Sequence, residues 1–364
     1  MRAFLEDAGW GAATINPLPG DASTRRYARI TDNGRHAMLM DQPQNAEQPP
    51  CPPDATPDQR AQLGYNAVAR LAGADCDRFI AAANFLREHG LSAPDVYAAD
   101  TANGFVLIED LGDALYADAL EHGVDEHVLY GAAIDALVRL QIQPAPNFLP
   151  PDKPLYPYDE TAQLAEVDLM TEWFMPAALG RAAHTDEVSE HRELWRAALR
   201  STRVSSPVFV HRDYHAQNLI WLPDRDGAAR VGIIDFQDAV AGARSYDLIS
   251  LIEDARRDVS PELGTSMTER YLTAVNADGP NVDPEEYRAQ MAVMAAQRNA
   301  KIAGIFARLY KRDGKPRYLG YLPRVWGYLN RDLAHPALAQ LKAWYDRVIP
   351  ENVRAAPPVK EQER

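Results

Sequence analysis

Two aspartates and an asparagine in the middle of the chain have side chains and a spacing that could take part in catalysis. Asp213 and Asn218 lie in the segment VFVHRDYHAQNLIWL, and Asp235 follows the apolar stretch Val231–Ile234. If the apolar residues form short strands, the loops between them aim these three side chains at one point. The oxygens of Asn218 and Asp235 suit Mg²⁺, which shares its shell with water and phosphate oxygens. Asp213 can then accept the proton of an attacking hydroxyl, so the pattern predicts phosphoryl transfer from ATP.

Each of these residues has a simpler explanation when it is taken alone. Asp and Asn favour turns, because their side chains hydrogen-bond nearby backbone groups. Any one of Asp213, Asn218 and Asp235 is therefore more readily a turn residue than a ligand. It is much harder to explain by turns that all three residues follow apolar runs at this spacing. We therefore predict a catalytic base beside a metal site.

The first part of the chain has the pattern of a small antiparallel sheet. Short alternating segments begin at Ile15, and Thr31–Gly34 (TDNG) between two of them is a hairpin signal. Six prolines between Pro43 and Pro57 predict a loop or insertion, because proline fixes φ and lacks an N–H donor. A further strand is predicted at Phe105–Ile108.

The remainder of the chain is mostly helical, with strands expected only within residues 208–235. Helices are predicted at residues 59–71, 77–88, 126–141, 158–179, 185–200, 245–258, 261–277, 284–310, 323–329 and 335–348. This order predicts an α+β protein with two unequal lobes. We expect residues 1–110 to form the small, nucleotide-binding lobe with the proline-rich insertion at 43–57, residues 111–350 the catalytic and acceptor-binding lobe, and residues 351–364 a polar tail.

Composition narrows the choice of partner. The net charge of −14 over 364 residues disfavours binding to nucleic acid and to anionic membranes, because both carry negative charge. Only Cys51 and Cys76 are present, which fits a reducing compartment. The N-terminus has no apolar signal-peptide core, and no apolar run approaches the ~18 residues of a membrane span. We expect a cytoplasmic protein that acts on a small molecule; the sequence leaves its oligomeric state open.

The central motif resembles a known superfamily. HRDYHAQN followed by DF is similar to the catalytic loop and metal aspartate of protein-kinase-like enzymes. His215, Gln237 and Asp247 match features of the aminoglycoside and choline phosphotransferase branch. Within it, PLPGDASTRRYARI, GFVLIEDLGD and RNAKIAGIFARLYKRDGKPRYLGYLPRVWGYL are similar to the anomeric kinases of N-acetylmuramate and N-acetylglucosamine in cell-wall recycling. The resemblance implies a two-lobed kinase fold, ATP as co-substrate and Mg²⁺.

The resemblance also implies residue roles. Asp213 matches the catalytic base, and Asn218 and Asp235 match the metal ligands. Structural members of the site are His211, Arg212, His215 and Asp247. The nucleotide-binding residues are Gly20, Ser23, Thr24, Arg25 and Arg26 in the phosphate-covering loop, and Glu109 and Leu111 at the hinge, through their main chain.

The chain departs from the family's pattern at the residue that usually binds the ATP phosphates. The family usually has a lysine at the end of the third strand, where this chain has Met40, and no lysine precedes Lys153. Arg25, Arg26 or Arg29 must replace it, unless metal and backbone position the phosphates alone. The missing lysine is also the argument for the alternative that the protein is a nucleotide-binding pseudokinase, which the complete Asp213 motif opposes.

The acceptor is less well specified. Arg298 and Lys301 are three residues apart and share a helix face, and Asp254 and Arg256 follow Asp247. Asp254 is predicted to bind sugar hydroxyls, and Arg256, Arg298 or Lys301 to bind a lactyl carboxylate. All four could instead be solvated surface charges. Alternatives within the kinases are an aminoglycoside-modifying enzyme and a kinase for another sugar or amine.

Overall fold

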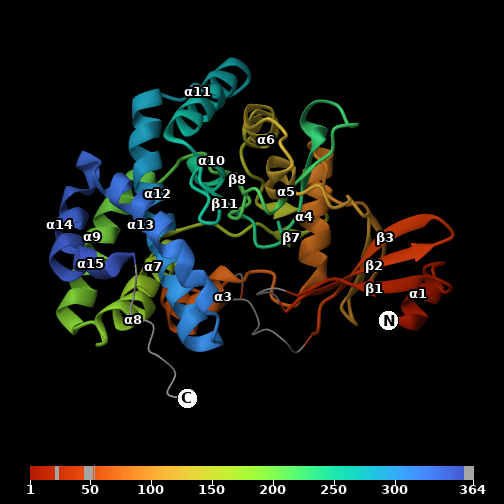
Figure 1. Cartoon of the computed structure of the whole chain (residues 1–364), viewed down its shortest axis with the longest axis horizontal. Helices are drawn as coiled ribbons and strands as arrows, with labels where there is room; N and C mark the ends of the chain where they lie inside the picture. The colour runs from red at the N-terminus through yellow and green to blue at the C-terminus, as the bar shows by residue number, and fades with distance from the viewer. Residues whose placement is uncertain (21–23, 45–51, 53, 356–364) are drawn as a thin grey trace.

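The computed structural model describes residues 1–20, 24–44, 52 and 54–355. A sheet lies at one end of the molecule and a large group of helices at the other, as Figure 1 shows. This arrangement confirms the predicted α+β class. The division at residue 110 remains a prediction.

The sheet has five antiparallel strands in the order β1-β2-β3-β5-β4. Their bounds are β1 Thr14–Pro17, β2 Arg26–Asp32, β3 Arg35–Asp41, β4 Val96–Asp100 and β5 Phe105–Ile108. The predicted hairpin turn joins β2 to β3 through Asn33 and Gly34, whose φ angles are 48° and 80°. Positive φ at both central positions matches the right-handed twist of the flanking strands, which is why Asn-Gly occurs here.

The two faces of the sheet pack against different neighbours. Leu39 points into a cluster with Leu5 of α1 (Arg2–Asp7) and Trp10. Met40 points the other way, into the main core that includes Phe79 of α4 (Cys76–Glu88). Alternation along β3 thus buries both faces of the strand.

The connection between β3 and α4 differs from the prediction. The helix expected at 59–71 is divided into α2 (Pro57–Leu63) and α3 (Tyr65–Ala69). Gly64 separates them with a φ of 78°, a left-handed value that interrupts helical hydrogen bonding. Most of the predicted proline-rich insertion, including Cys51, lies outside the described residues, and Pro57 begins α2.

The helical part contains the expected elements with some changed boundaries. Its main helices are α5 Tyr116–Glu121, α6 Glu126–Gln141, α7 Glu160–Leu169, α8 Met175–Leu179, α9 Thr185–Leu199, α10 Ser245–Ile252, α11 Pro261–Asp278, α12 Pro284–Asp313, α13 Leu322–Leu333, α14 Ala339–Val348 and α15 Glu351–Arg354. The helix predicted at 158–179 begins at Glu160 and contains a π-helical turn, Met170–Phe174, between α7 and α8. α10 ends at Ile252 rather than at Asp258, and α5 was not predicted.

Short strands after α9 form two antiparallel pairs. β8 (Val208–Val210) pairs with β11 (Val240–Gly242), and β9 (Leu219–Trp221) pairs with β10 (Val231–Ile233). A third pair, β6 (Phe148–Leu149) with β7 (Lys153–Pro154), lies in the connector before α7. The strands expected within residues 208–235 are confirmed. The expectation that strands occur only there is wrong, because β6, β7 and β11 lie outside that range.

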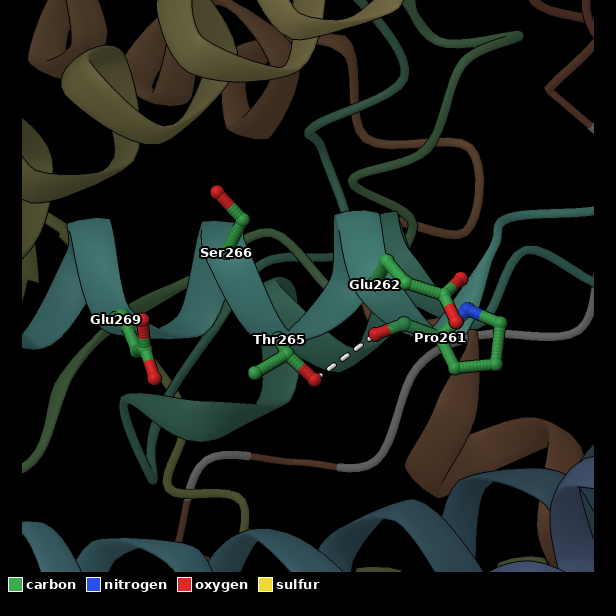
Figure 2. Close-up of a pocket in the computed structure, with 5 residues that line it drawn as sticks. All are labelled: Pro261, Glu262, Thr265, Ser266 and Glu269. Carbon is green, nitrogen blue, oxygen red and sulfur yellow. Dashed lines mark hydrogen bonds between the residues drawn. The ribbon is translucent and has the colours of Figure 1, made fainter.

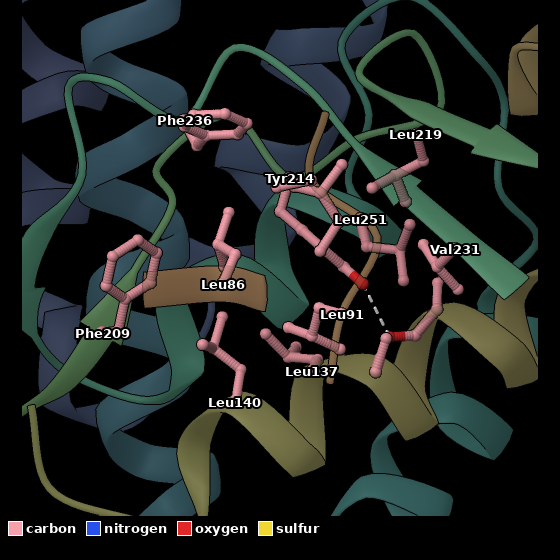
Figure 3. Close-up of a cluster of buried hydrophobic side chains, with 14 of the residues drawn as sticks. Leu86, Leu91, Leu137, Leu140, Phe209, Tyr214, Leu219, Val231, Phe236 and Leu251 are labelled. Carbon is pink, nitrogen blue, oxygen red and sulfur yellow. Dashed lines mark hydrogen bonds between the residues drawn. The ribbon is translucent and has the colours of Figure 1, made fainter. Parts of the chain in front are cut away.

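A large apolar core lies beneath these strands. Figure 3 shows side chains from α4, α6 and the strands meeting there, among them Leu86, Leu137 and Phe209. Tyr214 lies in the same cluster and donates its hydroxyl proton to the carbonyl of Ala133 at 2.8 Å. The segment between β8 and β9, which contains Asp213 and Asn218, is therefore anchored to the core by the packing of Tyr214. Among the described residues, no helix is both long and apolar enough to cross a membrane.

Candidate active site

Hydrogen bonds join the loops that carry the three predicted catalytic residues. Asp213 lies after β8, Asn218 immediately before β9, and Asp235 after β10. The N–H of Ile234 donates to the carbonyl of Asn218 at 3.1 Å. The imidazole of His211 contacts the carbonyl of Ile234 through Nε2 at 2.9 Å. The structure thus brings Asp213, Asn218 and Asp235 to one side of the paired strands.

The backbone of these loops adopts unusual conformations. Arg212 and Asp235 have φ angles of 77° and 63°, in the left-handed region that side chains other than glycine rarely adopt. Asp247 holds the first of them, because its carboxylate accepts from the N–H groups of His211 at 2.8 Å and Arg212 at 2.9 Å. Burial raises the pKa of Asp247 to about 6, against the opposing effects of His211 and these N–H donors. Such strain persists only where the surroundings impose it.

His211 has a defined tautomer in this network. The N–H of Asp213 donates to its Nδ1 at 3.2 Å, so Nδ1 must accept and Nε2 must carry the proton that is given to Ile234. His211 thereby connects the predicted catalytic loop, residues 211–218, to the predicted metal loop, residues 235–239. The contacts of His211, Arg212 and Asp247 are those of positioning groups, as their predicted structural role requires.

Asp213 is exposed, and its charge is set by its neighbours. Desolvation by the surrounding protein on its own raises the pKa of Asp213. Charges that include those of Lys301 and Arg212 outweigh this effect and hold the pKa well below its usual range. The carboxylate is therefore ionised at neutral pH, in the form that accepts a hydrogen bond from a hydroxyl.

Asn218 and Asp235 fit the predicted role of metal ligands. Asn218 donates its amide nitrogen to the carbonyl of Asp213 at 2.9 Å, so its amide oxygen is turned away from that contact. The side chain of Asp235 is 48 % exposed, and one of its oxygens accepts from Gln237 at 2.8 Å. In the described part of the chain no three His, Cys, Asp or Glu side chains gather as metal ligands. A cation here would therefore depend on these two oxygens together with phosphate oxygens and water.

The three arginines that could replace the missing lysine have different environments. Arg25 is buried, and its guanidinium lies 4.0 Å from the carboxylate of Asp235. Arg26 is exposed and pairs with Asp41 at 3.0 Å. Arg29 binds Asp110 at 2.6 Å and Asp113 at 2.7 Å, near the hinge. Only Arg25 is placed beside the predicted metal site.

Other residues around Arg25 complete the predicted nucleotide side. Tyr27 is half-buried, and desolvation by the surrounding protein raises its pKa to about 12 although the charge of Arg25 opposes the shift. Met40, at the lysine position, is fully buried in the core. Gly20 and Thr24 are described, and the Thr24 hydroxyl accepts weakly from Gln42 at 3.4 Å. Ser23 lies outside the described residues.

The predicted hinge residues have partly occupied main-chain groups. The N–H of Glu109 donates to the carbonyl of Asp95 at 2.8 Å, and its carboxylate pairs with Arg225 at 2.6 Å. An adenine base would therefore have to use the carbonyl of Glu109 or the backbone of Leu111. The Leu111 side chain contacts the region of Gly232 in β10.

Two of the four predicted acceptor residues are engaged by other protein groups. Arg298 is buried and donates to the Ser250 hydroxyl at 2.8 Å and to the carbonyl of Glu253 at 3.3 Å. Lys301 is buried and lies 3.0 Å from Glu166 and 3.2 Å from the Tyr246 hydroxyl. The alternative that these two residues are solvated surface charges is wrong, because α12 faces the core at both positions.

The other two lie beside the catalytic loop. Arg256 is half-buried, and one of its guanidinium nitrogens is 3.4 Å from Nε2 of His215. Asp254 is buried and accepts the N–H of Arg256 through Oδ1 at 2.8 Å. Burial lowers the pKa of His215 to about 4, although the charge of Asp254 raises it. Among the described residues, Oδ2 of Asp254 and Nδ1 of His215 have no hydrogen-bond partner.

Sequence reasoning missed Arg78, which ties α4 to the metal loop. Its guanidinium donates to the carbonyls of Gln237 and Ala239, both at 2.9 Å, and of Pro154 at 2.7 Å. The sequence did contain a signal that Arg78 is buried, because it falls beside Phe79 on the apolar stripe of DRFIAAANFL.

A separate surface depression lies on α11, away from these residues in sequence. Figure 2 shows its lining side chains, Pro261, Glu262, Thr265, Ser266 and Glu269, which border an open hollow of about 400 Å³. All of them come from one helix, and the Thr265 hydroxyl is bound to the carbonyl of Pro261 at 2.9 Å. Within the described part of the chain, its lining includes no side chain from a second element, so it does not compete with the loops of Asp213 and Asp235 as a candidate site.

These catalytic loops, on this fold, define a phosphotransferase. Residues 14–289 match the model of the phosphotransferase enzyme family, and the chain belongs to that family. It is 47 % identical over 358 residues to an N-acetylmuramate/N-acetylglucosamine kinase of Caulobacter vibrioides, covering 97 % of this chain and 96 % of the relative. A kinase with the same description from Pseudomonas aeruginosa is 33 % identical, with 92 % and 89 % covered.

The fold has a counterpart among solved structures. A microcompartment-associated aminopropanol kinase superimposes with a TM-score of 0.56 at 14 % identity, with 88 % of this chain and 94 % of that chain covered. This likeness confirms the two-lobed kinase architecture.

Proposed function

We propose that this phosphotransferase transfers the γ-phosphate of ATP to the anomeric hydroxyl of N-acetylmuramate or N-acetylglucosamine. The observation that carries the proposal is the 47 % identity over nearly the whole chain to a kinase described by both sugars. The complete set of Asp213, Asn218 and Asp235 supports catalysis and opposes the pseudokinase alternative. Because the reaction consumes ATP and a recovered cell-wall sugar, we infer that it takes place in the cytoplasm.

Asp213 is the proposed catalytic base. Its ionised carboxylate accepts a hydrogen bond from the sugar hydroxyl and takes its proton as the bond to phosphorus forms and ADP leaves. The products are the sugar 1-phosphate and ADP. His211 and Asp247 keep Asp213 in place through the backbone hydrogen bonds of its loop.

The phosphates are proposed to lie between Asn218, Asp235 and Arg25. Asn218 and Asp235 would hold Mg²⁺, which neutralises phosphate charge when bound. Arg25 is the cation proposed to replace the family lysine, because it is buried and its guanidinium lies beside Asp235. Thr24 and the backbone near Gly20 precede it and are proposed to cover the outer phosphates.

Asp254 and Arg256 are the proposed acceptor residues. Arg256 is half-buried next to His215, and His215 lies two residues from the base. A guanidinium in this position can pair the lactyl carboxylate of N-acetylmuramate in a bidentate manner. The free oxygen of Asp254 suits a sugar hydroxyl or amide N–H. Arg298 and Lys301 are weaker acceptor candidates, since protein partners already satisfy them.

The test is a phosphorylation assay with Mg-ATP over a panel of amino sugars, plain sugars, small amines and aminoglycosides. We expect N-acetylmuramate and N-acetylglucosamine to be converted to their 1-phosphates. The Asp213→Asn variant should lose about 10²–10⁴-fold in kcat with little change in nucleotide Kd, because a general base contributes that much. If only aminoglycosides are phosphorylated, the acceptor is an aminoglycoside and the proposed amino-sugar acceptor is wrong.

Acceptor recognition has its own test. Arg256→Ala should lower kcat/KM for N-acetylmuramate about 10–100-fold, since a charge-assisted hydrogen bond contributes about 1.5–3 kcal/mol. N-acetylglucosamine has no carboxylate and should change little. Arg257→Ala is the matched control, because Arg257 is adjacent and faces Glu126 at 3.7 Å instead. An unchanged ratio between the two sugars would remove Arg256 from the acceptor site.

A further inference from the structure

We propose that Glu166 of α7 is a positioning residue for phosphoryl transfer: a permanent internal counter-ion that holds Arg212 and thereby fixes the catalytic loop relative to the metal loop. The proposal rests on the proposed kinase activity but not on the identity of the acceptor. Neither the sequence motifs nor the comparisons assign a role to Glu166.

Glu166 is a fully buried carboxylate with four protein partners. Its Oε1 pairs with Arg212 at 2.5 Å and with Lys301 at 3.0 Å. Its Oε2 accepts from Gln297 at 3.1 Å and from the Tyr158 hydroxyl. Burial on its own raises the pKa of Glu166, and the charges of Lys301 and Arg212 reverse this effect and lower it to about 2. The carboxylate is therefore charged throughout the neutral range.

Arg212 uses its remaining donors to join separate parts of the site. Its guanidinium donates to the carbonyl of Ala69 at the end of α3 at 2.6 Å, and to the carbonyl of Asp238 in the metal loop at 3.4 Å. Its backbone immediately precedes Asp213. One side chain, oriented by Glu166, thus connects α7, α3, the metal loop and the catalytic loop, as a positioning residue must.

The helices are packed so that this pairing is possible. A Cβ on Gly304 of α12 would lie 2.5 Å from Cβ of Leu169 in α7, so only glycine allows the two helices to approach this closely. Lys301 and Gln297 are on the same helix, one and two turns before Gly304, and both reach Glu166. The close approach of α7 and α12 therefore delivers two of the four partners of the carboxylate.

The arrangement contrasts with switchable kinases. There, activation loops are ordered when phosphorylation creates a new arginine–phosphate pair. Here the partner of the catalytic-loop arginine is a built-in carboxylate, buried and fully hydrogen-bonded. The catalytic loop of this protein is consequently in its working position without modification.

The alternative is that Glu166 serves only stability, because removing one member of a buried ion pair leaves the others uncompensated. Purely structural loss lowers the fraction of folded enzyme but leaves the kcat and Mg²⁺ requirement of the folded molecules unchanged. A positioning role changes both, because Arg212 also holds the metal loop through Asp238. The two roles therefore differ in what the folded variant does.

The experiment compares Glu166→Gln with a control that is destabilised elsewhere. Leu341→Ala opens a cavity in the distant core beneath α14 and provides the matched loss of Tm. At a temperature where both variants are folded, we expect Glu166→Gln to lower kcat up to about 100-fold, as misplacement of a catalytic group by about 1 Å does. Its half-saturating Mg²⁺ concentration should rise several-fold, and Leu341→Ala should change neither quantity.

Glu166→Asp keeps the charge but shortens the side chain, and it decides the question if Glu166→Gln does not fold. It should bind ATP and show a lower kcat with a raised Mg²⁺ requirement. A folded Glu166 variant with parental kcat and Mg²⁺ dependence would overturn the proposal, as would an equal loss in Leu341→Ala. If the parent protein phosphorylates nothing, the proposed function fails, whereas failure of this inference leaves parental activity intact.

Discussion

Arg25, Arg26 and Arg29 lie within five positions of the chain but meet three different partners. Arg25 turns inward beside Asp235, Arg26 lies on the surface with Asp41, and Arg29 reaches the hinge. Alternation along β2 places Arg26 and Arg29, three residues apart, on opposite faces of the sheet, and Arg25 precedes the strand. The same residue type at adjacent positions is therefore expected to contribute very differently to nucleotide binding.

Arg25→Ala should raise the KM for ATP about tenfold or more, because a charge-assisted contact to phosphate contributes about 1.5–3 kcal/mol. Adenosine binding should stay nearly unchanged, since adenosine lacks the phosphates. Arg26→Ala is the matched control and should leave both quantities at parental values. Steady-state kinetics and adenosine titration measure them. A parental KM for ATP in Arg25→Ala would mean that Arg25 does not replace the family lysine.

Sequence alone could identify the residues that act through local spacing. Asp213, Asn218 and Asp235 are found because short strands place them at loop ends whatever the rest of the fold does. Arg298 and Lys301 were predicted to reach the acceptor from a shared helix face. The chain does not reveal, however, that Ser250 and Glu166 meet that face from other helices. Long-range partners of charged residues are a tertiary property and have no local signature.

At the scale of elements, helix starts were predicted well and helix interiors less well. Capping residues mark the starts of α4 at Asp75, α6 at Asp125 and α12 at Asp283. The break at Gly64 and the π-helical turn Met170–Phe174 were missed, because one glycine or one extra residue per turn hardly changes the hydrophobic pattern.

α9 contributes a testable pH dependence through His191. This imidazole is fully buried against Trp344 and Tyr345, and Trp195 donates to its Nε2 at 2.9 Å. Burial is the main cause that lowers its pKa from 6.5 to about 3. The unfolded chain then binds a proton below pH 6.5 that the folded protein does not, so stability falls as pH falls from about 6.5 toward 3.

Between pH 8 and pH 5, His191 should cost the protein about 2 kcal/mol of unfolding free energy. Urea unfolding at the two pH values measures the loss. His191→Gln should be less stable than the parent at pH 8. Between pH 8 and pH 5, however, its unfolding free energy should fall by about 2 kcal/mol less than that of the parent. The control is His127→Gln, at an exposed position of α6, which should follow the parent. Equal losses in the parent and His191→Gln would contradict the assignment.

At the scale of the whole molecule, Arg29 links the sheet to the hinge. It binds Asp110 and Asp113 together, and the Asp113 side chain is 78 % exposed. The hydrogen bond from Arg29 lowers the pKa of Asp113, so the pair stays charged at neutral pH. Exposed ion pairs are weakened by salt, so the orientation of the sheet over the helical part should depend on ionic strength.

Adenosine reports this dependence cleanly because it carries no charge. In the parent, its Kd should rise by a few-fold between 50 mM and 500 mM salt, as screening of partly exposed ion pairs implies. Arg29→Gln should have the raised Kd already at low salt and show little further change. Arg35→Gln, which removes a pair with Asp32 at the far turn of the same sheet, is the control. An identical salt response in the Arg29→Gln variant would exclude the link.

α10, the helix that carries Asp247, has no outward face. Every residue from Ser245 to Ile252 is buried, whereas α9 buries only His191, Trp195 and Leu199 over its greater length. Mutational tolerance should follow this difference: substitutions across α9 should be accepted at most positions and refused about once per turn. α10 should instead refuse them along its entire length. We therefore expect fewer accepted substitutions in α10 than in α9. This restriction comes from burial of the whole helix, since Asp247 is the one residue of α10 whose carboxylate binds the loop backbone.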